Sequence, residues 1–263
     1  MENVDLGGRA AVVTGGGDGI GRATALRLSR CGARVFVGDL RFPAETAEQF
    51  RRAGIAMRTC DVRREADLRA LIDGAAAQAG RLDVLVNNAG IGMVKQIGDV
   101  TEEDWSACLD TNLKGPFFGS KHAIRHMQGQ PSGGSIVNTA SNAGLLPRAH
   151  DPVYSISKMA LVALTKSLAL CHARDRIRVN CVCPGPVRDT GMMNADLDQA
   201  DDPAAEVRKY IAASPLAAAW DRMISPEEVA EAILYLAGDA AAMVTGTAIA
   251  IDGGKSLGVP PRG

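Results

Sequence analysis

A glycine-rich turn near the N-terminus is the feature that most limits what this chain can fold into. Residues 9–14 (RAAVVT) have the pattern of a buried strand, and residues 22–32 (RATALRLSRCG) have that of a helix. Between them, Gly15, Gly19 and Gly21 allow positive φ angles and the close approach of another group to the main chain. A strand, a tight turn and a helix in this order predict the first half of a βαβ unit.

The rest of the chain repeats this alternation of apolar strands and helices. Six further strands are expected, over residues 33–39, 55–62, 82–90, 135–141, 177–184 and 247–252. Helices are expected between them, over residues 43–53, 64–80, 101–127, 154–170 and 226–238, the third of them broken at Gly115–Pro116. Continuously apolar strands that alternate with helices are typical of a parallel sheet covered on both faces. The pattern therefore predicts an α/β protein with a doubly wound, mostly parallel, seven-stranded sheet, that is, a Rossmann fold.

The chain shows no linker and no shift in composition, so residues 1–263 are expected to form a single domain. Residues 186–225 have no regular pattern and are interpreted as a lid over the substrate, since long loops in compact domains often close active sites. Residues 255–263 are expected to form a short C-terminal tail.

Composition and charge argue against several classes of protein. Apolar residues make up 46% of the 263 residues, which is enough for a substantial core. The formal net charge is −1 and no run of five like charges occurs, which argues against binding to nucleic acid or to a membrane surface. The N-terminus carries acidic residues where a secretory signal would carry basic ones, so a cytoplasmic protein is expected.

The cysteines and histidines do not follow a metal-binding pattern. None of the six cysteines belongs to a C-x-x-C pair, and the four histidines are scattered. His122 and His126 share one face of an expected helix, but no third ligand accompanies them. We therefore expect reduced cysteines and no metal site.

The glycine turn carries the first functional prediction. A helix N-terminus offers free N–H groups and the positive end of the helix dipole, which together favour a pyrophosphate. Asp39 ends the second expected strand, 18 residues after Gly21, where a carboxylate accepts hydrogen bonds from an adenosine ribose. Asp39 and Asp18 would repel a 2′-phosphate, so NAD is favoured over NADP. Arg22 and Arg41 are the opposing signals, because either could reach a phosphate.

Residues after the third and fourth expected strands extend this site. Asp61 and Val62 could hold an adenine through a side-chain hydrogen bond and an apolar contact. The segment 87–90 (Asn-Asn-Ala-Gly) places two amides and a glycine where strand ends meet the cofactor crevice of an open α/β sheet.

A tyrosine and a lysine form the candidate catalytic pair. Tyr154 and Lys158 are four residues apart in an expected helix, so their side chains lie on one face, one turn apart. A free tyrosine has a pKa of about 10, and a neighbouring cation is expected to lower that pKa toward neutrality. Ser141 ends the preceding strand, where its hydroxyl could hydrogen-bond the same substrate oxygen. This arrangement suits acid–base catalysis.

Together, these motifs resemble the short-chain dehydrogenase/reductase family of the compact, single-domain type. The resemblance covers residues 9–254 and rests on Thr14-Gly15-(x)3-Gly19-Ile20-Gly21, Asn87-Asn88-Ala89-Gly90, Asn112, Ser141, Tyr154-(x)3-Lys158, Pro184-Gly185, Thr245-Gly246 and Asp252-Gly253-Gly254. It implies an NAD-dependent oxidoreductase that interconverts a secondary alcohol and a ketone by hydride transfer.

The resemblance also implies roles for individual residues. Tyr154 would exchange a proton with the substrate oxygen, and Lys158 would lower the Tyr154 pKa and bind the nicotinamide ribose. Ser141 would orient the substrate oxygen, and Asn112 would hold the helix geometry and a water that relays protons to Lys158. The expected cofactor site comprises Gly15, Asp18, Gly19, Ile20, Gly21, Asp39, Leu40, Asp61, Val62, Asn88, Ala89, Gly90, Tyr154, Lys158, Pro184, Gly185, Val187 and Thr190.

One position departs from the family pattern. Many relatives have a threonine five residues after the proline of the Pro-Gly motif, and this threonine binds the nicotinamide carboxamide. Asp189 occupies that position here, and Thr190 follows it. We interpret the loop as carrying one extra residue, so that Thr190 holds the carboxamide. The alternative is the backbone of Val187.

The expected substrate is apolar, with cyclic compounds included. Flexible methionines in the lid favour such a substrate over a phosphorylated one, and no cluster of arginines or lysines marks a carboxylate or an acyl-carrier partner. The expected substrate site combines Ser141, Asn142, Leu145, His150, Tyr154, Met192 and Met193.

Two alternatives stay open. An NADPH-dependent carbonyl reductase of the same family would require Arg22 or Arg41 to outweigh Asp39. A sensor that binds a dinucleotide without turnover would have no physical need for the complete set of catalytic side chains. Because relatives of this type commonly form homotetramers, we expect a homotetramer built through the long helices at residues 101–127 and 152–172 and the C-terminal segment.

Overall fold

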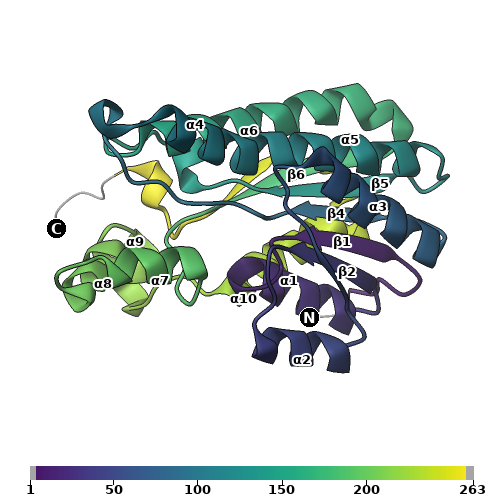
Figure 1. The fold of residues 1–263 in the computed structure, drawn as a ribbon, viewed down its shortest axis with the longest axis horizontal. Helices are drawn as coiled ribbons and strands as arrows, with labels where there is room; N and C mark the ends of the chain where they lie inside the picture. The colour runs from purple at the N-terminus through teal and green to yellow at the C-terminus, as the bar shows by residue number, and fades with distance from the viewer. Residues whose placement is uncertain (1–3, 259–263) are drawn as a thin grey trace.

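The sheet expected from the sequence is present (Figure 1). The computed structural model describes residues 4–258. Its strands are β1 (Ala10–Thr14), β2 (Arg34–Asp39), β3 (Ala56–Thr59), β4 (Val84–Asn87), β5 (Gly134–Thr139), β6 (Ile177–Pro184) and β7 (Ala248–Ile251). They pair in the order β3-β2-β1-β4-β5-β6-β7, and every pair is parallel. The doubly wound α/β fold class is therefore confirmed.

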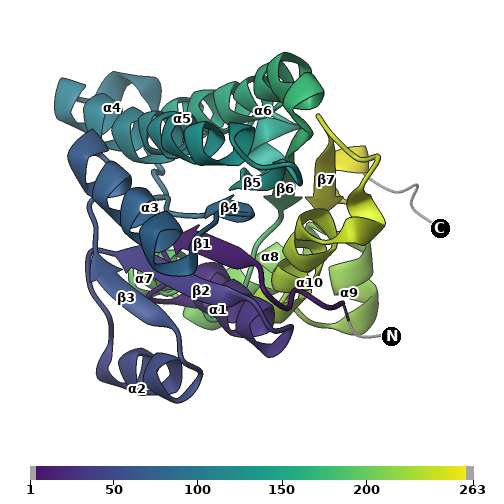
Figure 2. The same ribbon diagram turned by 90° about the vertical axis from the view of Figure 1, so that its right-hand side faces the viewer.

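Helices cover both faces of the sheet (Figure 2). One face carries α1 (Gly19–Arg30), α2 (Ala44–Arg52) and α10 (Pro226–Ala237). The other carries α3 (Glu65–Ala79), α4 (Glu102–Leu109), α5 (Gly115–Gln128) and α6 (Pro152–His172). Neighbouring residues of β1 pack on opposite sides: Val13 lies in the core with Leu28, and Val12 lies in the core with Ile72. Burial on both faces explains why the central strands are apolar throughout.

The helical stretch expected over residues 101–127 begins as predicted but is interrupted at a different place. Thr101 and Asp104 form a capping box at the start of α4. A single π-helical turn (Asp110–Lys114) then separates α4 from α5. The expected break at Gly115–Pro116 is wrong in position, because the interruption covers residues 110–114 and Pro116 lies in the first turn of α5.

Residues 186–225 contain regular structure, contrary to the sequence-based expectation. They form α7 (Gly191–Asp198), α8 (Pro203–Ala212) and α9 (Pro215–Trp220), which lie together at one end of the molecule (Figure 1). Thr190 and Asp202 cap the first two helices through their side chains. Helices of six to ten residues are too short to show a clear apolar period, which explains the error. Of the expected tail, residues 259–263 lie outside the described part of the chain.

Among the described residues, one helical segment, at positions 152–175, is long and apolar enough to cross a membrane by length and composition alone. Its mean hydropathy is 1.3, and 50% of that window is buried inside the fold. The core helix of a soluble protein meets the same criterion. The segment includes α6, which packs against β6.

A chain of buried polar side chains joins the centre of the sheet to the helices above it. Asn87 donates hydrogen bonds to Ser120 at 3.2 Å and to the Oδ1 of Asn138 at 2.9 Å. Asn138 in turn donates to the hydroxyl of Thr165 at 2.9 Å. The chain links β4 and β5 to α5 and α6, and it holds the helix that carries the candidate catalytic pair.

We expect Asn138→Ala to lower the free energy of unfolding by about 2–3 kcal/mol, because it removes two buried side-chain hydrogen bonds, one from Asn87 and one to Thr165. Urea unfolding at a fixed protein concentration measures this change. Asn194→Ala makes the same substitution at an exposed position of α7 and should leave the stability nearly unchanged. Equal effects of the two variants would contradict a stabilising role for the buried chain.

Candidate functional site

A cavity of about 610 Å³ opens at the carboxyl ends of the strands. β1 lies between β2 and β4 there, so the strand order reverses, and open α/β sheets bind ligands at such a point. Most of the predicted site residues line it: Gly15, Asp18, Gly19, Ile20, Asp39, Leu40, Asp61, Val62, Asn88, Ala89, Gly90, Ser141, Asn142, His150, Tyr154, Lys158, Pro184, Gly185, Val187, Thr190, Met192 and Met193. Segments far apart in the sequence therefore form one site.

Three predicted residues do not line the cavity. Gly21 packs beneath the turn, where a Cβ would lie 2.1 Å from the carbonyl oxygen of Gly15. Asn112 is fully buried behind the cavity wall. Leu145 is 37% exposed, on the loop that precedes α6. The structure therefore gives no support for a substrate contact by Leu145.

The turn between β1 and α1 is fixed from both sides. Gly15 has a φ of +64°, and a Cβ there would lie 2.5 Å from the Cα of Ala89. The Nδ2 of Asn88 donates to the carbonyl oxygen of Gly15 at 2.8 Å. The N–H of Gly17 donates to the carboxylate of Asp39 at 2.8 Å. These contacts hold the turn against β4 and β2, with the N-terminus of α1 at the edge of the cavity.

Asp61 and Val62 lie on the cavity wall after β3. The Arg63 guanidinium hydrogen-bonds both carboxylate oxygens of Asp61, with a shortest distance of 2.7 Å, and holds the pKa of that carboxyl below its usual value. Val62 packs against Gly115 at the start of α5. Both residues are therefore placed where an adenine contact was expected.

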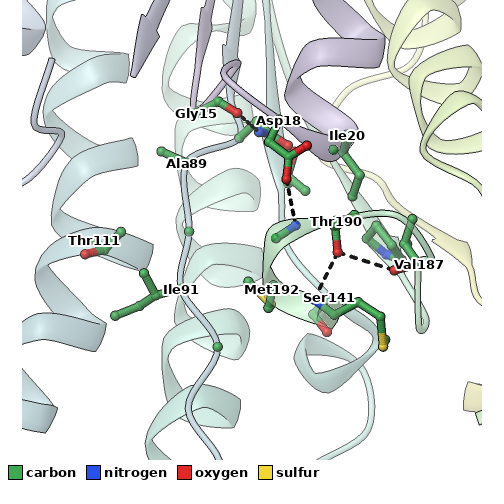
Figure 3. A pocket seen from close by; sticks show the side chains of 18 of the residues that line it. Gly15, Asp18, Ile20, Ala89, Ile91, Thr111, Ser141, Val187, Thr190 and Met192 are labelled. Carbon is green, nitrogen blue, oxygen red and sulfur yellow. Dashed lines mark hydrogen bonds between the residues drawn. The ribbon is translucent and has the colours of Figure 1, made fainter. Parts of the chain in front are cut away.

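Asp18 connects the glycine turn to the segment interpreted as a lid (Figure 3). Its carboxylate accepts a hydrogen bond of 2.7 Å from the backbone N–H of Gly191. A Cβ at Gly19 would lie 2.9 Å from the Cγ2 of Thr190. The first turn of α7 therefore rests directly on the glycine turn.

The geometry distinguishes Thr190 from Asp189, the residue at the family's threonine position. Asp189 has a left-handed φ of +54°, and its 63%-exposed side chain pairs with Arg188. Thr190 lines the cavity, and its hydroxyl accepts a hydrogen bond of 3.1 Å from the N–H of Met193 (Figure 3). Thr190 therefore faces the cavity, whereas the side chain of Asp189 is exposed.

Tyr154 and Lys158 lie on the buried side of α6, and Ser141 follows β5. The Nζ of Lys158 lies 5.7 Å from the centroid of the Tyr154 ring and donates to the carbonyl oxygen of Thr139 at 3.0 Å. The hydroxyl of Ser141 donates to Asn142 at 3.2 Å. The structure therefore brings the three predicted side chains to one wall of the cavity.

Burial changes the acidity of both members of this pair. It raises the pKa of Tyr154, and a hydrogen bond from Ser141 and the charge of Arg148 oppose that rise. It lowers the pKa of Lys158 to about 8, so the amine is still mostly protonated at neutral pH. The expectation that the pKa of Tyr154 lies below its free value is therefore wrong for this structure, because loss of hydration around the phenolate outweighs the nearby charges.

Asn112 lies in the π-helical turn between α4 and α5. Its side chain accepts from the N–H of Ile91 at 2.9 Å and donates to the carbonyl oxygen of Ile91 at 3.0 Å and to Ser157 at 3.1 Å. A Cβ on Gly90 would lie 3.2 Å from the Oδ1 of Asn112 and 3.3 Å from the Nζ of Lys158. Asn112 therefore fixes the loop after β4 against α6, close to Lys158.

Sequence analysis missed several polar residues of the cavity, among them Arg148, Asp196 and Tyr210. The guanidinium carbon of Arg148 lies 4.9 Å from the centroid of the Tyr154 ring. Burial raises the pKa values of Asp196 and Tyr210. No motif marks these residues, since one lies on a loop and the others lie on α7 and α8. Asp196 and Tyr210 could have been found only by predicting those two helices from the sequence.

The residues of the site fit a dinucleotide. The glycine turn keeps side chains away from the main chain, and a Cβ at Gly17 or Gly19 would collide with its neighbours. The N-terminus of α1 offers N–H donors to a pyrophosphate, and Asp39 offers an acceptor to a ribose. Across residues 4–258, no group of three or more His, Cys, Asp or Glu side chains is arranged to hold a metal ion.

Known proteins share both the sequence and the fold. cis-4-Hydroxycyclohexanecarboxylate dehydrogenase from Sinomonas cyclohexanicum is 42% identical over 252 residues, which cover 94% of this chain and 96% of that protein. 4-Formylbenzenesulfonate dehydrogenase from Comamonas testosteroni is 38% identical over 262 residues, which cover 97% of this chain and 100% of that protein. The crystal structure of a short-chain type dehydrogenase/reductase from Mycobacterium marinum matches with a TM-score of 0.85 and 33% identity, over 98% of each chain.

A family model agrees with these similarities. Residues 15–256 match the model described as Enoyl-(Acyl carrier protein) reductase. The chain therefore belongs to the short-chain dehydrogenase/reductase family. It follows that the protein is an oxidoreductase of the alcohol dehydrogenase type, which uses an NAD(P) dinucleotide and a small-molecule alcohol or ketone.

We expect Asp18→Ala to loosen the first turn of α7, because the N–H of Gly191 loses its carboxylate acceptor. A hydrogen bond to a charged group contributes about 1.5–3 kcal/mol, so the exchange of this amide should be faster by about 10- to 100-fold. Hydrogen exchange followed by mass spectrometry measures the rate over residues 190–194. Asp18→Asn keeps an acceptor oxygen, so its exchange rate should stay closer to that of the parent. Unchanged exchange in Asp18→Ala would refute the connection.

Proposed function

We propose that this protein is an NAD-dependent dehydrogenase that interconverts a secondary alcohol and a ketone by hydride transfer. The observation that carries the proposal is that Tyr154, Lys158 and Ser141 line the same cavity as the glycine turn. A dinucleotide bound along that turn supplies the hydride acceptor or donor. The chain itself supplies orientation, proton transfer and exclusion of water.

Tyr154 is the proposed acid–base residue. In alcohol oxidation the phenolate form of its side chain takes the hydroxyl proton of the substrate, and in ketone reduction the phenol form gives a proton to the carbonyl oxygen. Lys158 contributes a positive charge on the same helical face, and the Thr139 carbonyl holds its amine. The hydroxyl of Ser141 orients the substrate oxygen. Asn112 is a positioning residue, which fixes Ile91 and the wall beside Lys158.

Tyr154→Phe should reduce kcat by about 10²- to 10⁴-fold, because it removes the proton donor and keeps the ring. NADH binding, followed by nucleotide fluorescence, should stay within a few-fold of the parent. The assay uses a panel of secondary alcohols, cyclic and aromatic ones included, with NAD and with NADP. Retained turnover in Tyr154→Phe would overturn the assignment. Tight NADH binding by the parent without any turnover would favour a dinucleotide sensor instead.

Asp39 supports the choice of NAD over NADP. Its carboxylate lines the cavity and is held by the N–H groups of Gly17 at 2.8 Å and Arg41 at 3.3 Å. A carboxylate fixed at this place accepts hydrogen bonds from the ribose hydroxyl groups and repels a 2′-phosphate. Arg41 also lines the cavity, and this favours the NADPH-dependent alternative. Arg22 is absent from the lining residues.

Asp39→Asn should lower the ratio of kcat/KM for NAD to that for NADP by at least about tenfold, because it removes the repulsive charge and keeps an acceptor for Gly17. Steady-state kinetics with both nucleotides measure the ratio. Arg41→Ala serves as the partner variant. If the parent prefers NADP and loses that preference in Arg41→Ala, the NAD assignment is wrong.

The remaining cofactor contacts are assigned from their positions in the cavity. Thr190 is proposed to hold the nicotinamide carboxamide, since its hydroxyl lies near Val187 and faces the site. Asp61 and Val62 are proposed to hold the adenine. The segment 186–225 is proposed to close over the substrate, because α7 borders the cavity.

We further propose a cyclic or otherwise apolar substrate. Met192, Met193 and Val94 line the cavity, and flexible methionines adapt to apolar shapes. The relative from Sinomonas cyclohexanicum supports a cyclic alcohol, since its name specifies a hydroxycyclohexane ring. A homotetramer stays the expectation from the family resemblance, and a cytoplasmic location stays the expectation from the N-terminal sequence.

A further inference from the structure

One charged side chain of the cavity has no part in the chemistry described above. Arg148 lies between the short 3-10 helix at Asn142–Gly144 and α6, and it lines the cavity. Its guanidinium carbon is 4.9 Å from the centroid of the Tyr154 ring, within the range of a cation–π contact. A permanent positive charge is therefore held beside the proposed acid–base residue.

Asp151 holds this arginine in place. The side chain of Asp151 is fully buried, pairs with the guanidinium of Arg148, and accepts a hydrogen bond of 3.1 Å from the hydroxyl of Ser155. The backbone N–H of Arg148 donates to the same hydroxyl at 3.3 Å. The position of the guanidinium is therefore fixed by the buried side chain of Asp151 and its hydrogen bond to Ser155.

The support leaves one donor of the guanidinium unused. The Nε of Arg148 is buried and has no hydrogen-bond acceptor among the residues that the structure describes. A buried N–H without a partner costs free energy, so native proteins rarely retain one without a reason. The Oδ2 of Asp151 is likewise buried without a hydrogen-bond partner, so a small reorientation of the ion pair would satisfy both atoms. A ligand in the cavity therefore meets the other donors of the guanidinium, whose side chain is 32% exposed.

Other charged groups surround this position. Asp196 faces Arg148 from α7, and Glu206 on α8 adds negative charge near Asp196. Lys255, in the turn after β7, is close enough that the charge of Arg148 lowers its pKa in addition to the larger effect of burial. Asp151 is already engaged, so Asp196 is the acid of the cavity that an anionic ligand at Arg148 would meet.

We propose that Arg148 is a specificity-determining residue that binds an acidic group, a carboxylate or a sulfonate, on the substrate. A guanidinium presents planar N–H donors that match such oxyanions. The acidic group would lie beside Arg148, and the apolar body of the substrate would lie against Met192 and Met193. The proposal rests on the proposed dehydrogenase function, and it places a single arginine, not a cluster of basic residues, at the acidic group.

A competing role for Arg148 is an effect on Tyr154. The charge of Arg148 opposes the rise of the Tyr154 pKa that burial causes. A residue that acted only through Tyr154 would change kcat and its pH profile for every substrate alike. A residue that binds the acidic group changes the affinity for acidic ligands alone. Binding measurements with matched ligands therefore separate the two roles.

The test is calorimetric binding of cyclohexanecarboxylate, cyclohexanesulfonate and cyclohexanecarboxamide to the full-length protein, with and without NADH. The parent should bind at least one anion about tenfold or more tightly than the neutral amide. Arg148→Met should weaken the binding of that anion by about 10- to 100-fold and the binding of the amide by less than about threefold. The preferred anion identifies the acidic group as carboxylate or sulfonate.

Arg148→Met leaves the buried Asp151 without its partner, so a loss of binding in this variant can also reflect a loss of folding. Two further variants therefore test the proposal separately. Arg148→Lys keeps a cation for Asp151 but lacks the planar set of N–H donors, and it should bind the anion several-fold more weakly than the parent. Asp196→Asn removes the opposing charge and should bind the anion more tightly. Equal affinities of the parent for anion and amide, or equal losses for both ligands in Arg148→Lys, would overturn the proposal.

Failure of this inference is distinguishable from failure of the dehydrogenase function. Tyr154-dependent turnover of neutral alcohols without any preference for anions would refute the proposed role of Arg148 and support the dehydrogenase function. Binding of anions through Arg148 without any Tyr154-dependent turnover would support the anion site and refute the dehydrogenase function.

Discussion

The site depends on a parallel sheet whose central strands are buried on both faces. Parallel strands require a crossover helix between them, so all their carboxyl ends meet at one edge of the sheet. β1 is followed by β2 on one side and pairs with β4 on the other, and the crossovers therefore cover opposite faces. The gap between those crossovers is the crevice that holds Gly15, Asp39 and Asn88. The chemistry of the site follows from this topology.

The same burial that builds the site also opposes folding. The pKa of Lys158 is about 8 in the folded chain, against about 10.4 in an unfolded one. Between those values the unfolded chain binds more protons, so the contribution of Lys158 to stability falls as the pH drops from about 10.4 to about 8 and stays low below that. The carbonyl of Thr139 and the hydrogen bonds of Asn112 compensate by fixing the amine and the wall beside it.

The sequence predicted the parts of the fold and the site that local patterns encode. Central strands such as β1 and β4 are recognisable because every residue in them is buried, and Gly15 is recognisable because only glycine fits against Ala89. The π-helical turn at Asn112 was not predictable, because its residues suit an α-helix equally well. The pKa of Tyr154 depends on burial by distant segments, which no spacing of residues reveals.

The segment from Thr190 to Tyr210 connects the two ends of the cavity. At one end, Gly191 is held by Asp18 of the glycine turn, so the start of α7 takes its position from the proposed cofactor site. At the other end, Asp196 and Tyr210 line the same cavity as Arg148. The residues of α7 share one hydrogen-bonded ladder. The contact of Gly191 with Asp18 therefore helps to fix the helix that places Asp196 at the cavity.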